Sequence, residues 1–133
     1  MNVKLGKAGF NPYQLETIVA VDYDGTLVDN DLNWIQECIK FLKLLQSNGV
    51  RLIMWSCRPK SYLQKEMERL NREEGIKIEY INENLPEIVE GYEEESRKIF
   101  AHFYVDDAAI AYGRFDWTYI TKKVLDHHFY REL

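Results

Sequence analysis

The stretch IVAVDYDGTL, residues 18–27, decides how the rest of the chain is interpreted. Its first four residues, Ile18 to Val21, are all apolar, which is typical of a short strand buried in a parallel sheet. The run ends in Asp22, and Asp24 follows two positions later. Because Gly25 lets the backbone turn there, both carboxylates can face one cavity, where one can attack while the other moves a proton. Asp-Gly-Thr is also ordinary turn chemistry, so a purely structural role stays open for this stretch alone.

Outward from this strand, apolar runs alternate with helical patterns. The predicted elements are a helix over residues 33–48, a strand over 50–55, a helix from Ser61 to about Glu74, an edge strand over 76–81, a strand over 103–105 and a helix capped by Asp116. Gly49 and Gly75 stand where left-handed caps end the first two helices, and Ser61 with Gln64 forms a capping-box pattern. The alternation predicts an α/β fold with a doubly wound, mostly parallel sheet.

Length and composition favour one domain in the reducing cytoplasm. The chain has 133 residues, with residues 1–17 as an irregular lead-in and a core over about 18–125. Lys and Arg number 17 against 22 Asp and Glu, and this balance argues against general binding to nucleic acid or anionic membranes. No apolar run reaches the ~18 to 20 residues that span a bilayer. Cys38 and Cys57 form no C-x-x-C pair, which favours a cytoplasmic protein without disulfides.

Two further predicted strands also end in polar residues. Ser56 follows the strand over residues 50–55, and the pair Asp106 and Asp107 follows the strand over 103–105. Ligands bind at the carboxyl ends of parallel strands, so we expect these residues near Asp22. Adjacent carboxylates repel, and holding them there is costly without a hard cation such as Mg²⁺. An Asp pair after a strand is also a common helix cap, which is the alternative role.

The motifs together resemble a known family. The stretch Asp22-Tyr23-Asp24-Gly25-Thr26-Leu27, the stretch Trp55-Ser56-Cys57-Arg58-Pro59 and the pair Asp106-Asp107 occur in the order of the first, second and fourth motifs of the haloacid dehalogenase (HAD) superfamily of phosphohydrolases. The chain looks like a small capless bacterial or phage member. The resemblance implies a HAD-like Rossmannoid domain that hydrolyses phosphomonoesters.

The resemblance also implies roles for individual residues. Asp22 would be the nucleophile that forms an aspartyl-phosphate, and Asp24 the general acid and base. Mg²⁺ would be held by Asp22, the Asp24 backbone carbonyl and Asp106, with Asp107 as a further acidic ligand. Ser56 and Lys98 would grip the phosphate, and Gly25, Thr26, Cys57 and Arg58 would support the phosphate-binding loops. The basic residue of the third motif has little sequence specificity, so Arg97, Lys60 and Arg58 compete with Lys98 for that role.

These observations predict a Mg²⁺-dependent phosphatase of unknown substrate. Residues 28–32 leave no room for a cap domain, and residues 60–96 are filled by a helix, a strand and a short acidic connection. An open site suits a large phosphorylated substrate, or a lid from another subunit of a homo-oligomer. One alternative is a nucleic-acid end phosphatase or nucleotidase, suggested by Arg58 and Lys60. Another is a non-catalytic phosphate-binding or regulatory module with the same fold.

Overall fold

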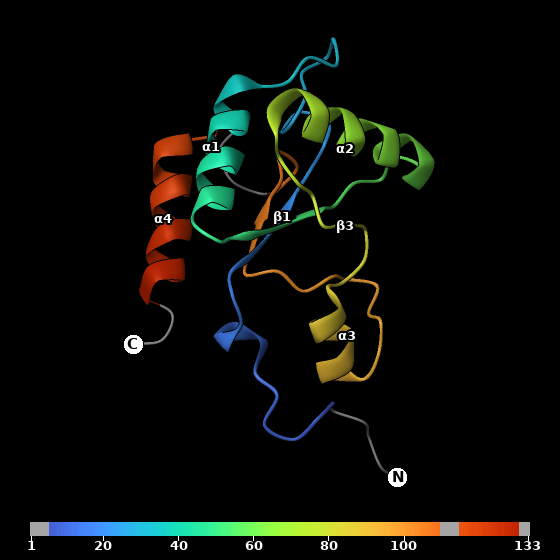
Figure 1. Ribbon diagram of the computed structural model, residues 1–133, viewed down its shortest axis with the longest axis vertical. Helices are drawn as coiled ribbons and strands as arrows, with labels where there is room; N and C mark the ends of the chain where they lie inside the picture. Colours follow the sequence, from blue (N-terminus) through green and yellow to red (C-terminus); the bar gives the residue numbers. More distant parts are fainter. Residues whose placement is uncertain (1–5, 110–114, 131–133) are drawn as a thin grey trace.

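A computed structural model, which describes residues 6–109 and 115–130, shows an α/β domain built on a four-stranded sheet (Figure 1). The strands lie in the order β3-β2-β1-β4, and all neighbours are parallel. The strands are β1 (Ile18–Val21), β2 (Arg51–Met54), β3 (Tyr80–Ile81) and β4 (Phe103–Val105). The helices are α1 (Gln36–Ser47), α2 (Lys60–Glu74), α3 (Pro86–Tyr92) and α4 (Trp117–Tyr130), and a short 3₁₀ helix, η1, covers Pro12–Gln14.

The strand order explains why helices cover both faces of the sheet. The chain steps in one direction from β1 to β2 to β3, and α1 and α2 pack on the same face. The chain then returns across the sheet to β4, and α3 lies on the opposite face (Figure 1). Side chains of β1 alternate accordingly: Val19 and Val21 join the cluster with α1, α2 and α4, whereas Ile18 and Ala20 pack toward α3. The predicted doubly wound parallel sheet is confirmed.

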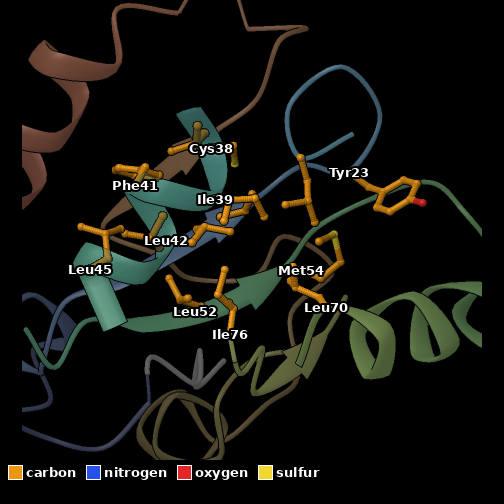
Figure 2. Packing of buried hydrophobic residues seen from close by; sticks show 14 of the residues in the cluster. Tyr23, Cys38, Ile39, Phe41, Leu42, Leu45, Leu52, Met54, Leu70 and Ile76 are labelled. Carbon is orange, nitrogen blue, oxygen red and sulfur yellow. The ribbon is translucent and has the colours of Figure 1, made fainter. Parts of the chain in front are cut away.

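The larger core lies between the sheet and helices α1, α2 and α4. Figure 2 shows Leu52 and Met54 of β2 beside Ile39 and Leu42 of α1, with Leu70 of α2 nearby. These five side chains are at most 2% exposed. Burying apolar area in this way stabilises a fold by roughly 25 cal/mol for each Å² removed from water. The core therefore fixes the strands whose carboxyl ends carry the polar residues.

The first two helices differ from the sequence expectation at their starts. Helix α1 begins at Gln36, because Trp34 instead forms an antiparallel bridge with Val28. The capping-box interpretation of Ser61 and Gln64 is wrong, because α2 already begins at Lys60 and its N-cap, Pro59, makes no side-chain cap bond. The predicted caps at the other ends are confirmed: Gly49 and Gly75 have φ of +84° and +69°.

The connection between α2 and β4 holds the other differences. The edge strand predicted over residues 76–81 shortens to Tyr80–Ile81, which pairs only with Ile53 and Met54 at the end of β2. The segment expected to be a short acidic connection contains α3, which starts at Pro86 in the first helical turn. Helix α4 starts as predicted, because the Asp116 carboxylate accepts a bond from the Tyr119 N–H.

The lead-in packs on α3 at the amino end of β1. The Lys7 N–H donates to the Gly91 carbonyl at 2.8 Å, and the Phe10 ring meets the Tyr92 ring edge-on at 5.1 Å. This segment enters β1 at Ile18 and so reaches the sheet at the end opposite Asp22 (Figure 1). Among the described residues, no helix is long and apolar enough to cross a membrane.

The packing of the core predicts that two leucines of α1, Leu42 and Leu44, contribute differently to the free energy of unfolding. Leu42 is completely buried and Leu44 is 43% exposed. We expect Leu42→Ala to lower the free energy of unfolding by about 2–4 kcal/mol, because it leaves a cavity in the core. Leu44→Ala, the matched control, should cost less than about 1 kcal/mol. Urea unfolding of both variants measures the difference, and equal losses would contradict this description of the core.

Candidate functional site

The acidic cluster lies where the strand order reverses. From β1 the chain adds β2 and β3 on one side of β1, and it then returns to add β4 on the other side. Ligands of open α/β sheets bind at such a switch point. Asp22 directly follows β1, and its N–H donates to the Val105 carbonyl of β4 at 3.0 Å. Asp106 and Asp107 directly follow β4. One carboxylate oxygen from each of Asp22, Asp106 and Asp107 lies within 4.8 Å of the others.

Thr26 and Gly25 hold this cluster together. The buried Thr26 hydroxyl donates to Oδ2 of Asp22 at 3.3 Å and accepts the Asp107 N–H at 3.3 Å, so it joins the loops after β1 and β4. Gly25 has φ of +76°, and a Cβ there would lie 2.2 Å from Oδ2 of Asp107. Only glycine therefore allows both the turn and the approach of the Asp107 carboxylate.

The cluster has an excess of negative charge. Burial, a side-chain hydrogen bond with Asp107 and the charge of Asp106 together raise the pKa of Asp22 to about 7. A divalent cation bound by these carboxylates would favour their ionised forms, because its charge would offset the repulsion between them. Three hard oxygen donors from separate side chains suit Mg²⁺. The residues present therefore fit the metal that the sequence predicts.

The loop after β2 supplies the basic group of the site. The Arg58 guanidinium donates from Nε and Nη2 to the two carboxylate oxygens of Asp24, at 2.8 and 2.7 Å. The Cζ atom of Arg58 lies 5.3 Å from the centroid of the Tyr62 ring, and this cation–π contact helps to fix the Arg58 side chain. These two hydrogen bonds hold the pKa of Asp24 below its ordinary value. The Ser56 hydroxyl accepts the Arg58 N–H at 3.1 Å.

The remaining predicted residues lie less directly in the site. The Asp24 carboxylate lies outside the three-carboxylate cluster, so its backbone carbonyl stays the predicted metal ligand. Cys57 is exposed beside Ser56. The Lys98 ammonium lies 5.2 Å from the Tyr104 ring centroid, and no ion pair joins Lys98 to a carboxylate in the described part of the chain. Its third-motif role stays a prediction.

The competitors of Lys98 for the third-motif role differ in their partners. Lys60 pairs with Glu83 at 3.3 Å. Arg97 is exposed. Arg58 is the basic residue that binds a predicted site aspartate among residues 6–109 and 115–130.

Asn82 is a candidate site residue that the sequence patterns did not predict. This residue follows β3, and its side-chain amide binds the backbone of Ser56. Its position could have indicated a role in the site. Asn82 directly follows the predicted edge strand, and the carboxyl end of that strand lies on the same side of the sheet as Asp22 and Ser56. That signal is weak, because asparagine is a common turn residue.

The parallel sheet and the residues at its switch point define a Rossmann-like α/β domain with a polar site at its carboxyl edge. Residues 19–125 match the model of the haloacid dehalogenase-like hydrolases, and the chain belongs to this family. Membership indicates hydrolase activity. The structure is similar to that of a conserved protein from Bacteroides thetaiotaomicron, with 32% identity, a TM-score of 0.68 and coverage of 84% of this chain and 92% of that chain. No protein of curated function matches the chain.

Gly25 provides a test of the cluster that leaves its carboxylates in place. Gly25→Ala should weaken Mg²⁺ binding about tenfold or more, because the new Cβ displaces the Asp107 carboxylate. Gly75→Ala is the matched control, since Gly75 also has positive φ but has no atom within 4 Å of its Cβ position. Both variants should lose about 1–2 kcal/mol of stability from backbone strain. Calorimetric titration with Mg²⁺ tests this, and equal affinities in the two variants would exclude the displacement.

The raised pKa of Asp22 predicts how stability depends on pH without metal. Between the ordinary value of 3.8 and the folded value of about 7, the folded state holds the proton more strongly than the unfolded state. Stability of the metal-free protein should therefore fall as pH rises through this range. Asp22→Asn should remove this contribution and stabilise the metal-free protein at neutral pH by about 1–2 kcal/mol, a value reduced for partial solvent exposure.

Urea unfolding in EDTA at several pH values measures this effect. Asp126→Asn is the control, because Asp126 lies on α4 and pairs with Lys122. It should keep the pH dependence of the wild type. An Asp22→Asn protein that is no more stable than the wild type at neutral pH would contradict the raised pKa.

Proposed function

We propose that this protein is a Mg²⁺-dependent phosphomonoesterase that works through an aspartyl-phosphate on Asp22. The observation that carries the proposal is the cluster of Asp22, Asp106 and Asp107 at the switch point, within 4.8 Å of one another. Family membership supports hydrolysis as the reaction class. The presence of Asp24, two positions after Asp22, supports a phosphatase, because it supplies a carboxylate for proton transfer.

The proposed reaction has two displacements at phosphorus. A carboxylate oxygen of Asp22 forms a bond to phosphorus as the bond to the leaving oxygen breaks, and Asp24 gives that oxygen a proton. Asp24 then takes a proton from the water that attacks phosphorus, and the bond to Asp22 breaks, releasing inorganic phosphate. Mg²⁺, held by Asp22, Asp106 and the Asp24 backbone carbonyl, would neutralise charge on the phosphoryl oxygens.

The loop after β2 offers donors to the phosphoryl group. The Ser56 hydroxyl accepts from Arg58 and keeps its own proton to donate. The N–H of the exposed Cys57 has no acceptor among the described residues. Phosphoryl transfer depends mainly on such positioning and on neutralising charge, so these two donors fit the proposed substrate contacts. We propose Lys98 as an additional cation for the phosphate.

The ion pair between Arg58 and Asp24 bears on the proton transfer. While Arg58 is bound, Asp24 stays ionised and is a poor proton donor. An arriving phosphoryl group offers the guanidinium a second anionic partner. Loss of the guanidinium from Asp24 would return the pKa of that carboxyl toward its ordinary value, so substrate binding would help to prepare the general acid.

The substrate is proposed only as a class. The two basic residues that suggested a nucleic-acid end are both paired with carboxylates, Arg58 with Asp24 and Lys60 with Glu83. The chain as a whole carries a net charge of −5. These charges give no particular support to a polyanionic substrate, and we therefore propose phosphomonoesters without naming the leaving group.

Hydrolysis of an aryl phosphate at neutral pH with Mg²⁺ tests the proposal. We expect activity in the wild type, its loss in EDTA, and a fall of about 10³-fold or more in Asp22→Asn, because the nucleophile is gone. Asp22→Asn is also the control for a contaminating phosphatase, and Asp126→Asn, a substitution on α4, should retain wild-type activity. An Asp22→Asn protein that keeps full activity would refute the proposal. Phosphate binding without turnover in the wild type would favour the binding-module alternative.

A further inference from the structure

Asn82 has an unusual backbone conformation directly after β3. Its N–H donates to the Met54 carbonyl at 2.8 Å, which extends the pairing of β3 with β2 by one bond. Its φ is +55°, in the left-handed region that asparagine tolerates better than most residues. This turn leaves the side chain of Asn82 beside the loop that follows β2.

The side-chain amide of Asn82 binds both backbone groups of Ser56. Its Oδ1 accepts the Ser56 N–H at 2.8 Å, and its Nδ2 donates to the Ser56 carbonyl at 2.7 Å. The amide thus replaces the strand partner that Ser56 lacks beyond the end of β2. Two hydrogen bonds to the backbone of the same residue restrict both the rotation and the displacement of Ser56.

Further hydrogen bonds connect Ser56 to Asp24. The Ser56 hydroxyl accepts the Arg58 N–H, and the Arg58 guanidinium binds both carboxylate oxygens of Asp24. A displacement of the Ser56 backbone would therefore move the proposed phosphate donors and also the arginine that binds the proposed general acid.

We propose that Asn82 is a positioning residue for the phosphate-binding loop: its amide holds Ser56 and, through Ser56, the backbone of Arg58. This inference rests on the proposed function, because it assigns Ser56 to the phosphoryl group. Asn82 acts through Ser56 and is not assigned a contact with the substrate. The role needs an N–H₂ donor, a carbonyl acceptor and tolerance of positive φ on one short side chain, which asparagine combines.

Two substitutions separate the amide from the backbone turn. Asn82→Gly keeps the tolerance of positive φ and removes both side-chain bonds. Asn82→Asp keeps the shape and the acceptor, but it loses the donor and places a carboxylate oxygen against the Ser56 carbonyl. We expect each substitution to raise KM and to weaken binding of inorganic phosphate about tenfold. The reason is that moving the phosphate-binding groups by about 1 Å weakens their contacts with the phosphoryl group.

Asn84 provides the matched control. Its side chain is buried and also bonds across loops, with Nδ2 donating to Glu95 and Ser96 and Oδ1 accepting the Phe100 N–H, but it has no bond to Ser56. Asn84→Ala should lower the unfolding temperature without changing KM or phosphate affinity. The experiment measures unfolding temperature, aryl phosphate kinetics and calorimetric binding of inorganic phosphate in Mg²⁺, all well below the unfolding temperature.

The outcomes distinguish this inference from the proposed function. Wild-type KM and phosphate affinity in both Asn82 variants would overturn the positioning role while hydrolysis by the wild type stands. A wild type that binds phosphate but hydrolyses nothing would refute the phosphatase, and Asn82 would then be judged by phosphate affinity alone. A wild type that neither binds phosphate nor hydrolyses aryl phosphate would overturn both. If Asn84→Ala lost as much phosphate affinity as Asn82→Gly, the effect of Asn82 would be a general structural one and the positioning role would be overturned.

Discussion

The parallel pairing of β1 with β4 forces Asp22 to lie beside the acidic pair that follows β4. Partial burial of Asp22 and the like charges beside it oppose folding unless the carboxylates are protonated or neutralised, and the pKa of Asp22 is raised for both reasons, burial being the larger. The buried core on the two faces of the sheet keeps the strands paired against this repulsion. An energetically unfavourable group of carboxylates is thus retained at the position in the fold where ligands of such sheets bind.

Beyond the strand ends, side chains add to the last backbone hydrogen bonds and connect the loops. Thr26 joins the loops after β1 and β4, Arg58 joins the loop after β2 to Asp24, and Asn82 joins β3 to Ser56. Each strand of the sheet therefore contributes to one continuous group of polar contacts along its carboxyl edge. This arrangement suits phosphoryl chemistry, in which charge must be met by donors and cations held in fixed positions.

The sequence predicted elements well where the local signal and the tertiary environment agree. The apolar run of β1 is buried, and Gly49 ends α1 in a left-handed conformation as expected. Prediction failed where a local pattern competed with long-range contacts. Trp34 delays the start of α1 by bridging to Val28, and β3 is short because it pairs only with the end of β2. Helix α3 has too few residues for a clear helical period.

By itself, the sequence determined which residues follow the buried strands, and hence the family, the acidic character of the edge and the turn at Gly25. These are properties of neighbours along the chain, which periodicity and residue type report directly. Only the tertiary structure decided that Asp22 meets Asp107, that Arg58 binds Asp24 and that Asn82 holds Ser56. Those contacts join segments far apart in the chain, and they depend on strand order and on the direction of each side chain. Neither property is encoded in a local pattern, because both arise when the whole sheet packs.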